Sequence, residues 1–144
     1  MPNTHNISRV EDCPIISLAQ HHHDNGNLSV VENMEDVPFD IKRVYYLYDI
    51  PGGEERGGLS HKECFEFIFA ASGSFDIEIF DGINKKKISL NRSYQGLLVI
   101  PGIWRELKNF SSGSVCLVIA SQHYNEEDYV RNYDEFMDLT ANKR

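Results

Sequence analysis

A histidine and a glutamate lie close together in residues 56–73, RGGLSHKECFEFIFAASG, and both residue types perform chemistry in proteins. The histidine is His61 and the glutamate is Glu66. Imidazole and carboxylate groups bind divalent metal ions, and imidazole also takes up and releases protons near neutral pH. The two residues therefore predict either a metal site or a cleft in which His61 moves a proton.

The spacing around this pair is similar to that of two short sequence motifs of cupin barrels. The first motif reads glycine, an H-x-H pair, glutamate and glycine, and its places hold Gly53, Leu59, His61, Glu66 and Gly73. The second reads proline, glycine, histidine and asparagine, and its places hold Ile100, Gly102, Arg105 and Asn109. The spacing is kept, but a leucine and an arginine stand at two of the four metal-ligand positions.

These two replacements argue against a bound metal ion. Divalent first-row metals are usually held by three or four imidazole, thiolate or carboxylate donors. Leu59 has no lone pair, and the guanidinium of Arg105 is a permanent cation that repels a metal ion. Only His61 and Glu66 remain as ligands, so we expect a barrel without a functional metal.

The composition limits the classes of function. The 144 residues, of which 41% are hydrophobic and 25% charged, suit one soluble domain. A net charge of -8 disfavours nucleic-acid binding, and no apolar run approaches the roughly 20 residues that span a bilayer. The N-terminus lacks the order of a secretory signal, and three cysteines without a CxxC pair predict neither disulfides nor structural zinc. We therefore expect a cytoplasmic protein that binds neither membranes nor nucleic acid.

Strand-like segments, which must position the candidate residues, dominate the chain. Phe75, Ile77 and Ile79 alternate with Asp76 and Glu78, as expected when one face of a strand is buried. Turn residues separate the runs, and there is no βαβ rhythm. With the motif spacing, this predicts a single all-β domain over 1–144, a cupin or double-stranded β-helix (jelly-roll) barrel. The predicted strands, rich in β-branched and aromatic residues, are 14–19, 27–33, 41–50, 65–71, 74–81, 85–90, 96–100 and 114–121.

Only the C-terminal segment, 125–144, is predicted to be helical. Asn125 is a candidate N-cap, and acidic residues follow it in the first turn. We expect the helix to pack on the outside of the barrel. One apolar stripe of the helix would consist of Tyr129, Tyr133, Phe136 and Met137.

A second cluster of possible metal ligands consists of the adjacent residues His21, His22 and His23. A tract of this kind can bind metal adventitiously. It precedes a turn signal, Asn25-Gly26, and we expect an exposed connector rather than a functional site.

Several longer stretches together resemble one known family. They are FDIKRVYYLYDIPGGEERGG, SGSFDIEIFDG and GLLVIPGIWRELKNFSSGSVCLVIASQHYNEEDYVRNYDEF, and the likeness covers about residues 24–139. They are similar to the dTDP-4-keto-6-deoxyglucose 3,4-ketoisomerases, also called the WxcM-like or sugar 3,4-oxoisomerase family. The resemblance implies a homodimeric cupin without metal or organic cofactor, acting on a dTDP-linked 4-keto-6-deoxy sugar.

The resemblance also implies a biosynthetic role. The product would serve the synthesis of 3-amino-3,6-dideoxy sugars for surface glycans such as O-antigen or S-layer glycans. In such a dimer, the N-terminal segment 1–23 is a candidate for exchange between subunits.

The cleft of this family usually reads R-G-x-H-A-H-K, and residues 56–62 read RGGLSHK. Arg56, His61 and Lys62 match, whereas Leu59 stands in place of the first histidine. The resemblance implies that Arg56 and His61 belong to the active site. It implies no role for Leu59, because the family has a histidine at this position.

The implied reaction moves a ketone from C4 to C3 of the sugar. It requires removal of the C3 proton, an enediol or enediolate, and a new proton at C4. His61 is the predicted base, and Arg56 or Arg105 could stabilise the oxyanion. One imidazole can serve both carbons if it carries the proton across a single face of the sugar. Leu59 therefore leaves the mechanism feasible, although it removes a polar partner for His61.

Further substrate-binding residues are predicted, each with an alternative. Arg43 and Tyr45 share one face of the strand 41–50, and we place them in the cleft rather than on a solvated face or in an interface. Glu66 is predicted to support the cleft by pairing with an arginine. Arg131 is either a pyrophosphate ligand, reaching across a dimer, or an exposed helix residue.

Two other functions stay open. Leu59 fits a catalytically impaired cupin that binds a sugar nucleotide or a protein partner. A metal-dependent cupin oxygenase would need ligands that the sequence does not supply.

Overall fold

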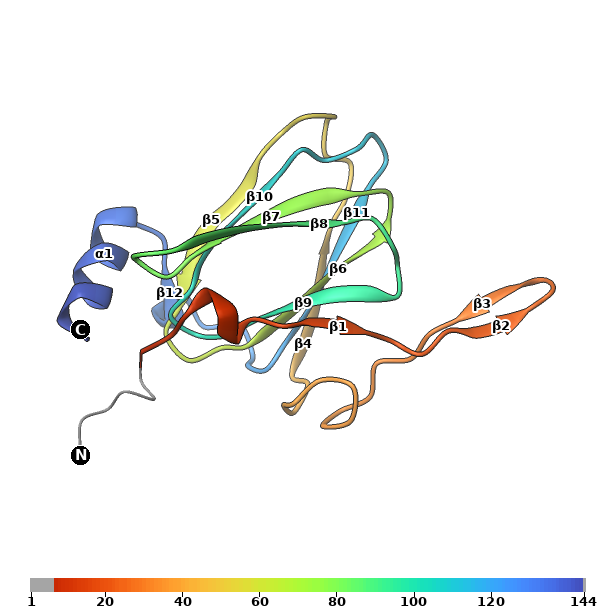
Figure 1. Ribbon diagram of the computed structural model, residues 1–144, viewed down its shortest axis with the longest axis horizontal. Coiled ribbons are helices and arrows are strands. Elements are labelled where there is room, and N and C mark those ends of the chain that lie inside the picture. The colour runs from red at the N-terminus through yellow and green to blue at the C-terminus, as the bar shows by residue number, and fades with distance from the viewer. Residues whose placement is uncertain (1–6, 144) are drawn as a thin grey trace.

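Two antiparallel five-stranded sheets form the barrel in the computed structural model, which describes residues 7–143 (Figure 1). From β4 to β12 the chain passes from one sheet to the other at every connection except that between β7 and β8, as in a jelly roll. The first sheet has the order β1(Ile15–Ser17), β9(Gln95–Val99), β6(Glu66–Ser72), β11(Val115–Ala120) and β4(Arg43–Leu47). The second has the order β12(Tyr129–Val130), β5(Arg56–His61), β10(Trp104–Lys108), β7(Phe75–Phe80) and β8(Lys85–Leu90).

The jelly-roll barrel confirms the predicted fold class, while some strand predictions need correction. The strand predicted at 27–33 is wrong after Leu28, because the chain there leaves a hairpin and packs on an apolar cluster of the first sheet. β5 and β10 carry no clear strand signal, since their glycines and charged residues are poor strand formers. Pairing with each other and, for β10, with β7 makes them strands.

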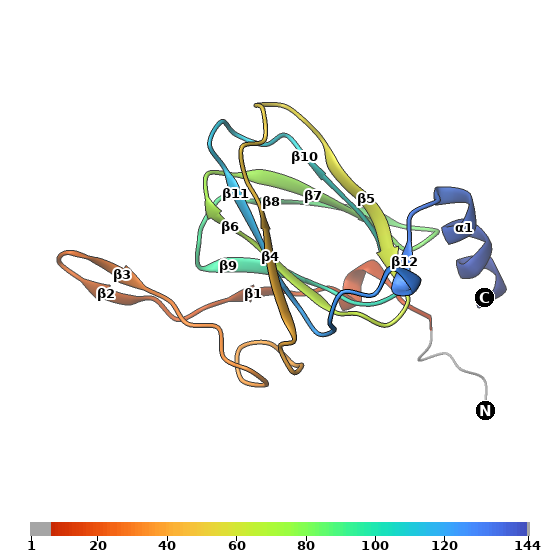
Figure 2. The same ribbon diagram turned by 180° about the vertical axis from the view of Figure 1, so that it is seen from behind.

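The N-terminal part contains a short 3-10 helix, η2(Val10–Asp12), and a two-stranded hairpin, β2(His21–His23) and β3(Gly26–Leu28). Figure 2 shows this hairpin projecting away from the barrel. The three histidines are exposed, as expected, and they form the first strand of the hairpin. Nδ1 of His22 lies 2.6 Å from Oδ1 of Asn27, its partner across the hairpin. Residues 1–6 of the segment considered for exchange lie outside the described residues.

The space between the two sheets holds the main apolar core. Phe75, Ile77 and Ile79 on β7 are at most 1% exposed, whereas Asp76 and Glu78 between them are half-buried. The predicted alternation is therefore confirmed. Burying one side chain of this size stabilises the fold by roughly 1.5–3 kcal/mol.

The C-terminal segment pairs as a strand before it becomes helical. Asn125 caps a short 3-10 helix, η3(Glu126–Asp128), and β12 follows it. α1(Tyr133–Asn142) begins only after a second cap, Asn132. The prediction of a helix from Asn125 onward is wrong because β12 pairs with β5, and this pairing removes Tyr129 from the predicted helical stripe.

α1 packs against the outside of the second sheet, as predicted. Phe136 is 2% exposed and forms an apolar cluster with Trp104 and Val130. Within residues 7–143, no helix is long and apolar enough to cross a membrane. Residue 144 of the predicted helical segment lies outside the described residues.

Gly96 on β9 lies directly against β6 and leaves no room for a side chain. A Cβ at this position would come within 2.5 Å of the Phe67 ring. Gly96→Ala should therefore lower the free energy of unfolding by about 1–3 kcal/mol, measured by urea denaturation. Gly52→Ala is the control, because the nearest atom there is 4.0 Å away, and it should change stability by less than about 0.5 kcal/mol. Equal losses in the two variants would contradict this packing.

Candidate active site

A buried ion pair between Glu66 and Arg105 lies inside the barrel. Glu66 is the first residue of β6, Arg105 lies on β10, and their side chains are 0% and 4% exposed. The guanidinium donates two hydrogen bonds to one carboxylate oxygen, at 2.9 Å from Nη2 and 3.2 Å from Nε. It also donates to the Gly57 carbonyl at 3.2 Å and to the Tyr45 hydroxyl at 3.1 Å. The arginine is therefore fixed by hydrogen bonds to three different strands.

The guanidinium dictates the local shape of β5. Gly57 has φ +77, and a Cβ there would overlap the Arg105 guanidinium. The register between β5 and β10 also shifts here, because Arg105 pairs with Leu59 whereas Leu107 pairs with Arg56. An irregularity of this kind bends a strand and re-aims its side chains. Only glycine suits position 57 beside this arginine.

Burial and charge act in opposite directions on the ion pair. Burial raises the pKa of Glu66, but the Arg105 guanidinium, with the nearby His61 and Tyr45 side chains, holds this pKa below its usual range. Burial likewise lowers the pKa of Arg105, and Glu66 and Tyr45 outweigh it and raise this pKa. Burial and the Glu66 charge raise the pKa of Tyr45, so its hydroxyl stays protonated and donates to Oε2 of Glu66. Glu66 and Arg105 are thus both charged at neutral pH.

His61 stands at the end of β5 and is oriented by an aspartate. The residue is 5% exposed, and its Nδ1 lies 2.9 Å from Oδ2 of Asp128. The same carboxylate accepts backbone N–H groups from Glu63 at 2.8 Å and Cys64 at 3.3 Å. A carboxylate with these partners is an acceptor, so Nδ1 donates and carries the proton. The lone pair of the imidazole is therefore on Nε2.

Nε2 of His61 is buried without a hydrogen-bond partner. It lies 3.3 Å from Oε2 of Glu66, but this contact lacks hydrogen-bond geometry. Nε of Arg43, at the same end of the barrel, is buried and unpartnered in the same way. Such atoms are rare in folded proteins, and two of them close together indicate a place for a polar ligand. Glu66 would stabilise the positive charge that forms when Nε2 takes up a proton.

Tyr129 connects this imidazole to two arginines. Its ring centre lies 4.5 Å from that of His61, and its hydroxyl accepts a hydrogen bond from Nη2 of Arg43 at 3.2 Å. The Arg131 guanidinium lies 4.3 Å from the same ring centre. Arg131 also forms a bidentate ion pair with Glu126, at 2.7 and 3.0 Å. Hydrogen bonds from Arg131 and from a tyrosine hydroxyl lower the pKa of Glu126 to about 2.

The structure brings most of the predicted residues together. Arg43 and Tyr45 are half-buried and alternate with exposed residues, as predicted for cleft-facing side chains. Arg131 lies near them, although it precedes α1 rather than lying on it. Arg56 is exposed at the opposite end of β5, roughly 16 Å along the strand from His61. The predicted neighbourhood of Arg56 and His61 therefore does not form, and Arg105 is the arginine that meets Glu66.

Leu59 is buried two residues before His61, so both side chains lie on the same face of β5. It is 6% exposed and pairs with Arg105 across the sheet. Among the described residues, the three apolar clusters of the fold do not include it. Leu59 thus puts an apolar side chain among polar groups, where the cupin motif has its first histidine.

One group of described residues brings three possible metal-ligand atoms within 4.8 Å of one another, and it consists of His61, Cys64 and Asp128. The Asp128 oxygens already accept hydrogen bonds from the imidazole and two backbone N–H groups. Burial raises the pKa of the Cys64 thiol, and a protonated thiol is a poor ligand. The contacts of this group are those of an oriented histidine.

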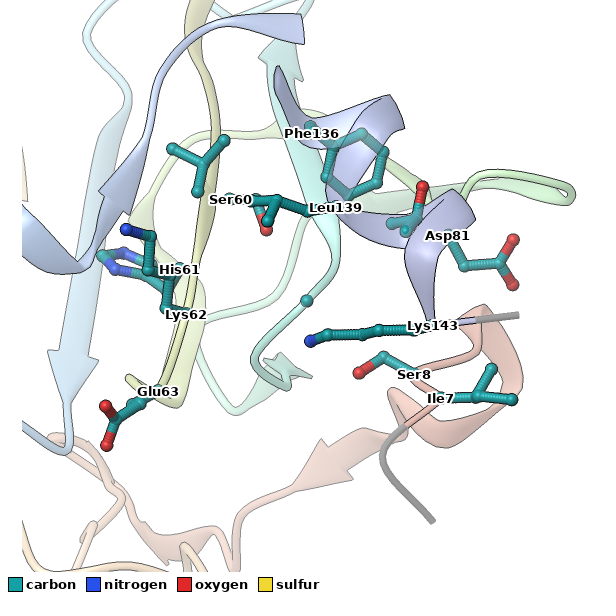
Figure 3. Close-up of a pocket in the computed structure, with 13 residues that line it drawn as sticks. Ile7, Ser8, Ser60, His61, Lys62, Glu63, Asp81, Phe136, Leu139 and Lys143 are labelled. Carbon is teal, nitrogen blue, oxygen red and sulfur yellow. The ribbon is translucent and has the colours of Figure 1, made fainter. Parts of the chain in front are cut away.

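A cavity of about 320 Å³ lies on the other side of β5, beneath α1 (Figure 3). Its lining includes Ser60, His61, Phe136, Leu139 and Lys143, and Figure 3 shows the His61 ring directed away from its centre. The cavity therefore borders His61, whereas the two nitrogens of its ring contact Glu66 and Asp128.

Asp128 and Tyr129 were missing from the predicted site. Both lie in a segment whose sequence suggests the first turn of a helix, and no motif marks them. Their roles depend on the pairing of β12 with β5, in which Tyr129 lies opposite His61. They could have been identified only by knowing the register between β12 and β5.

The fold and the site define a jelly-roll barrel with a buried histidine flanked by two carboxylates. A family profile described as "FdtA: WxcM-like, C-terminal" matches residues 11–141. The chain is 40% identical over 116 residues to a TDP-4-oxo-6-deoxy-alpha-D-glucose-3,4-oxoisomerase of Aneurinibacillus thermoaerophilus, covering 81% of this chain and 84% of that protein. This protein therefore belongs to the WxcM-like FdtA family of sugar 3,4-ketoisomerases.

Solved structures agree with this assignment. QdtA, a sugar 3,4-ketoisomerase from Thermoanaerobacterium thermosaccharolyticum, superimposes with a TM-score of 0.90 at 36% identity, over 94% of this chain and 98% of QdtA. A 3,4-ketoisomerase from Helicobacter canadensis gives a TM-score of 0.88 at 41% identity, over 90% of this chain and 98% of that one.

Removing Arg105 should leave the Glu66 charge buried without its partner. Arg105→Met is expected to lower the free energy of unfolding at pH 7 by about 3–5 kcal/mol, measured by urea denaturation. Adding Glu66→Gln removes the uncompensated buried charge and should recover part of the lost free energy of unfolding. A double variant no more stable than the single one would contradict a compensating role for Arg105.

The same pair has a pH signature. Because the pKa of Glu66 is lowered in the fold, its ion pair contributes fully above the unfolded pKa of about 4.3 and is lost as pH falls through the folded value. In Arg105→Met the guanidinium no longer opposes the effect of burial, which raises the pKa of Glu66, so the carboxyl takes up a proton as pH falls and the deficit relative to the wild type should shrink between pH 7 and pH 4. An equal deficit at both pH values would contradict this.

Proposed function

We propose that this protein moves the keto group of TDP-4-keto-6-deoxyglucose from C4 to C3, as an intramolecular oxidoreductase. A relative of this chain is named for this activity. One QdtA structure with a histidine-to-asparagine substitution contains TDP-4-keto-6-deoxyglucose. The observation that carries the proposal is Nε2 of His61, a buried nitrogen without a hydrogen-bond partner on a ring that Asp128 holds at Nδ1.

His61 is the base in this proposal. Nε2 takes the proton from C3 while the C4 carbonyl oxygen becomes the oxyanion of an enediolate. The imidazolium then returns a proton to C4, and the proton of the C3 hydroxyl passes to the C4 oxyanion as the new carbonyl forms at C3. Protons and electrons balance without a cofactor. Glu66 and Asp128 stabilise the imidazolium between the two steps, because one carboxylate faces each nitrogen.

The oxyanion needs a fixed partner, and we assign this role to the remaining guanidinium N–H of Arg105, while the Tyr45 hydroxyl stays bonded to Glu66. Both are held in place before the reaction by Glu66, so little reorganisation is needed when charge develops. Arg56, the alternative for this role, is exposed far along β5.

Arg43 and Arg131 are proposed to bind the diphosphate of the substrate. The protein has a net charge of -8, so an anionic ligand needs specifically placed arginines. Arg43 has an unpartnered Nε and donates from Nη2 to the Tyr129 hydroxyl, and Arg131 lies over the ring of that tyrosine. Guanidinium groups match phosphate oxygens in geometry as well as in charge.

We further propose a homodimer in the cytoplasm. Val44 and Tyr46 on the outer side of β4 and Tyr48 just beyond its end are 53%, 58% and 60% exposed, an apolar surface suited to a second copy. The projecting hairpin β2–β3 suggests that the N-terminal segment 1–23 is exchanged in this dimer.

The product of the proposed reaction would serve the synthesis of 3-amino-3,6-dideoxy sugars for surface glycans such as O-antigen or S-layer glycans.

A second candidate is a binding module that holds a sugar nucleotide without turnover. The observation that favours it is Leu59, which replaces the first histidine of the motif. Tight binding of TDP without conversion of the 4-keto sugar would support it.

The proposed activity is tested by ¹³C NMR of TDP-4-keto-6-deoxyglucose incubated with the purified protein. We expect the carbonyl carbon to change from C4 to C3. His61→Asn should reduce the rate by about 10²–10⁴-fold, because the base is removed. His123→Asn, at an exposed histidine, is the matched control and should keep the wild-type rate. A His61→Asn variant as active as the control would remove His61 from the mechanism.

A further inference from the structure

Tyr129 is the residue at which the imidazole and both arginines of the site meet. Its ring contacts His61, its hydroxyl accepts from Arg43, and the Arg131 guanidinium lies over it. Neither the family resemblance nor a sequence motif gives this tyrosine a role.

The backbone fixes this tyrosine relative to the base. Tyr129 lies directly opposite His61 in the β12–β5 ladder, and residues so paired present their side chains on the same face, about 5 Å apart. The segment enters this ladder from η3, whose last residue, Asp128, binds Nδ1 of the same imidazole. Two successive residues therefore act on His61, one on a ring nitrogen and one on the ring face.

Arg43 depends on Tyr129 for its position. Among residues 7–143, no carboxylate forms an ion pair with Arg43, in contrast to Arg131, which pairs with Glu126. The polar contact of Arg43 is the bond from Nη2 to the Tyr129 hydroxyl, and its guanidinium otherwise lies over the rings of Tyr45 and Tyr124, at 5.2 and 5.6 Å. The Arg43 charge is thus held in place but is not compensated by a carboxylate within the described part of the chain. A guanidinium in this state can bind an anion.

We propose that Tyr129 is a positioning residue with two separable actions. Its hydroxyl sets Arg43 for the diphosphate of the sugar nucleotide, and its ring keeps the His61 imidazole in place for proton transfer. This inference rests on the proposed function. It assigns binding to the hydroxyl and turnover to the ring, so the two can be separated by substitution.

Two substitutions separate the two actions. Tyr129→Phe removes only the hydroxyl, and we expect TDP to bind about tenfold more weakly and KM to rise similarly, with kcat within about twofold of the wild type. Tyr129→Leu removes the ring as well and should also lower kcat by about tenfold or more, because a misplaced base reacts slowly. Calorimetric titration measures TDP binding, and product NMR measures kcat and KM.

Tyr133→Phe is the matched control. This tyrosine lies in α1, where its ring packs on Phe80 and Trp104, so the same substitution should leave TDP binding, KM and kcat unchanged. A Tyr129→Phe variant that binds TDP like the control would overturn the link to Arg43. A Tyr129→Leu variant with the kcat of Tyr129→Phe would overturn the link to His61.

The test also distinguishes this inference from the proposed function. TDP binding without any turnover of the 4-keto sugar would contradict the proposed isomerase and the action of the ring, while the effect of Tyr129→Phe on binding would still decide the link to Arg43. A wild-type protein that does not bind TDP would overturn the diphosphate site and this inference together.

Discussion

Charge compensation at Glu66 is the constraint on which the rest of the site depends. An ionised carboxylate that is 0% exposed inside a barrel would cost several kcal/mol of desolvation without a paired cation. At these positions the cupin motif carries metal ligands, whereas here the Arg105 guanidinium supplies the positive charge as part of the chain. The size of this group in turn requires Gly57 and the irregular register of β5.

A fixed cation at this place changes what the neighbouring histidine can do. A metal ion would take the lone pair of an imidazole, but a guanidinium has only donors and leaves it free. Asp128 then determines which nitrogen carries the proton, and Tyr129 covers the ring. The interior remains polar and charged, and Nε2 lies 3.3 Å from Oε2 of Glu66, on a ring that packs against the tyrosine contacted by Arg43 and Arg131.

The fold and half of the site follow from local sequence patterns. The alternation in β7 and the spacing from Gly53 to Gly73 predicted the barrel, because both depend only on the period of a strand and the length of its turns. The inward position of Tyr45 followed from the same period. Asp128 and Tyr129 could not be predicted, because the tertiary pairing with β5 overrides a local helix signal. The sequence also suggested that Arg56 lies beside His61, but residues close in sequence are far apart along an extended strand.

The account rests on the hydrogen-bonding roles of the two His61 ring nitrogens, with the proton on Nδ1 and Nε2 free. Long-range ¹H–¹⁵N NMR of the imidazole at neutral pH tests this directly, because protonated and unprotonated ring nitrogens have well-separated ¹⁵N shifts. We predict an unprotonated Nε2 in the wild type and a mixture of the two tautomers in Asp128→Asn, in which an amide can also donate to Nδ1. A wild-type spectrum with the proton on Nε2, or one that Asp128→Asn leaves unchanged, would contradict the account.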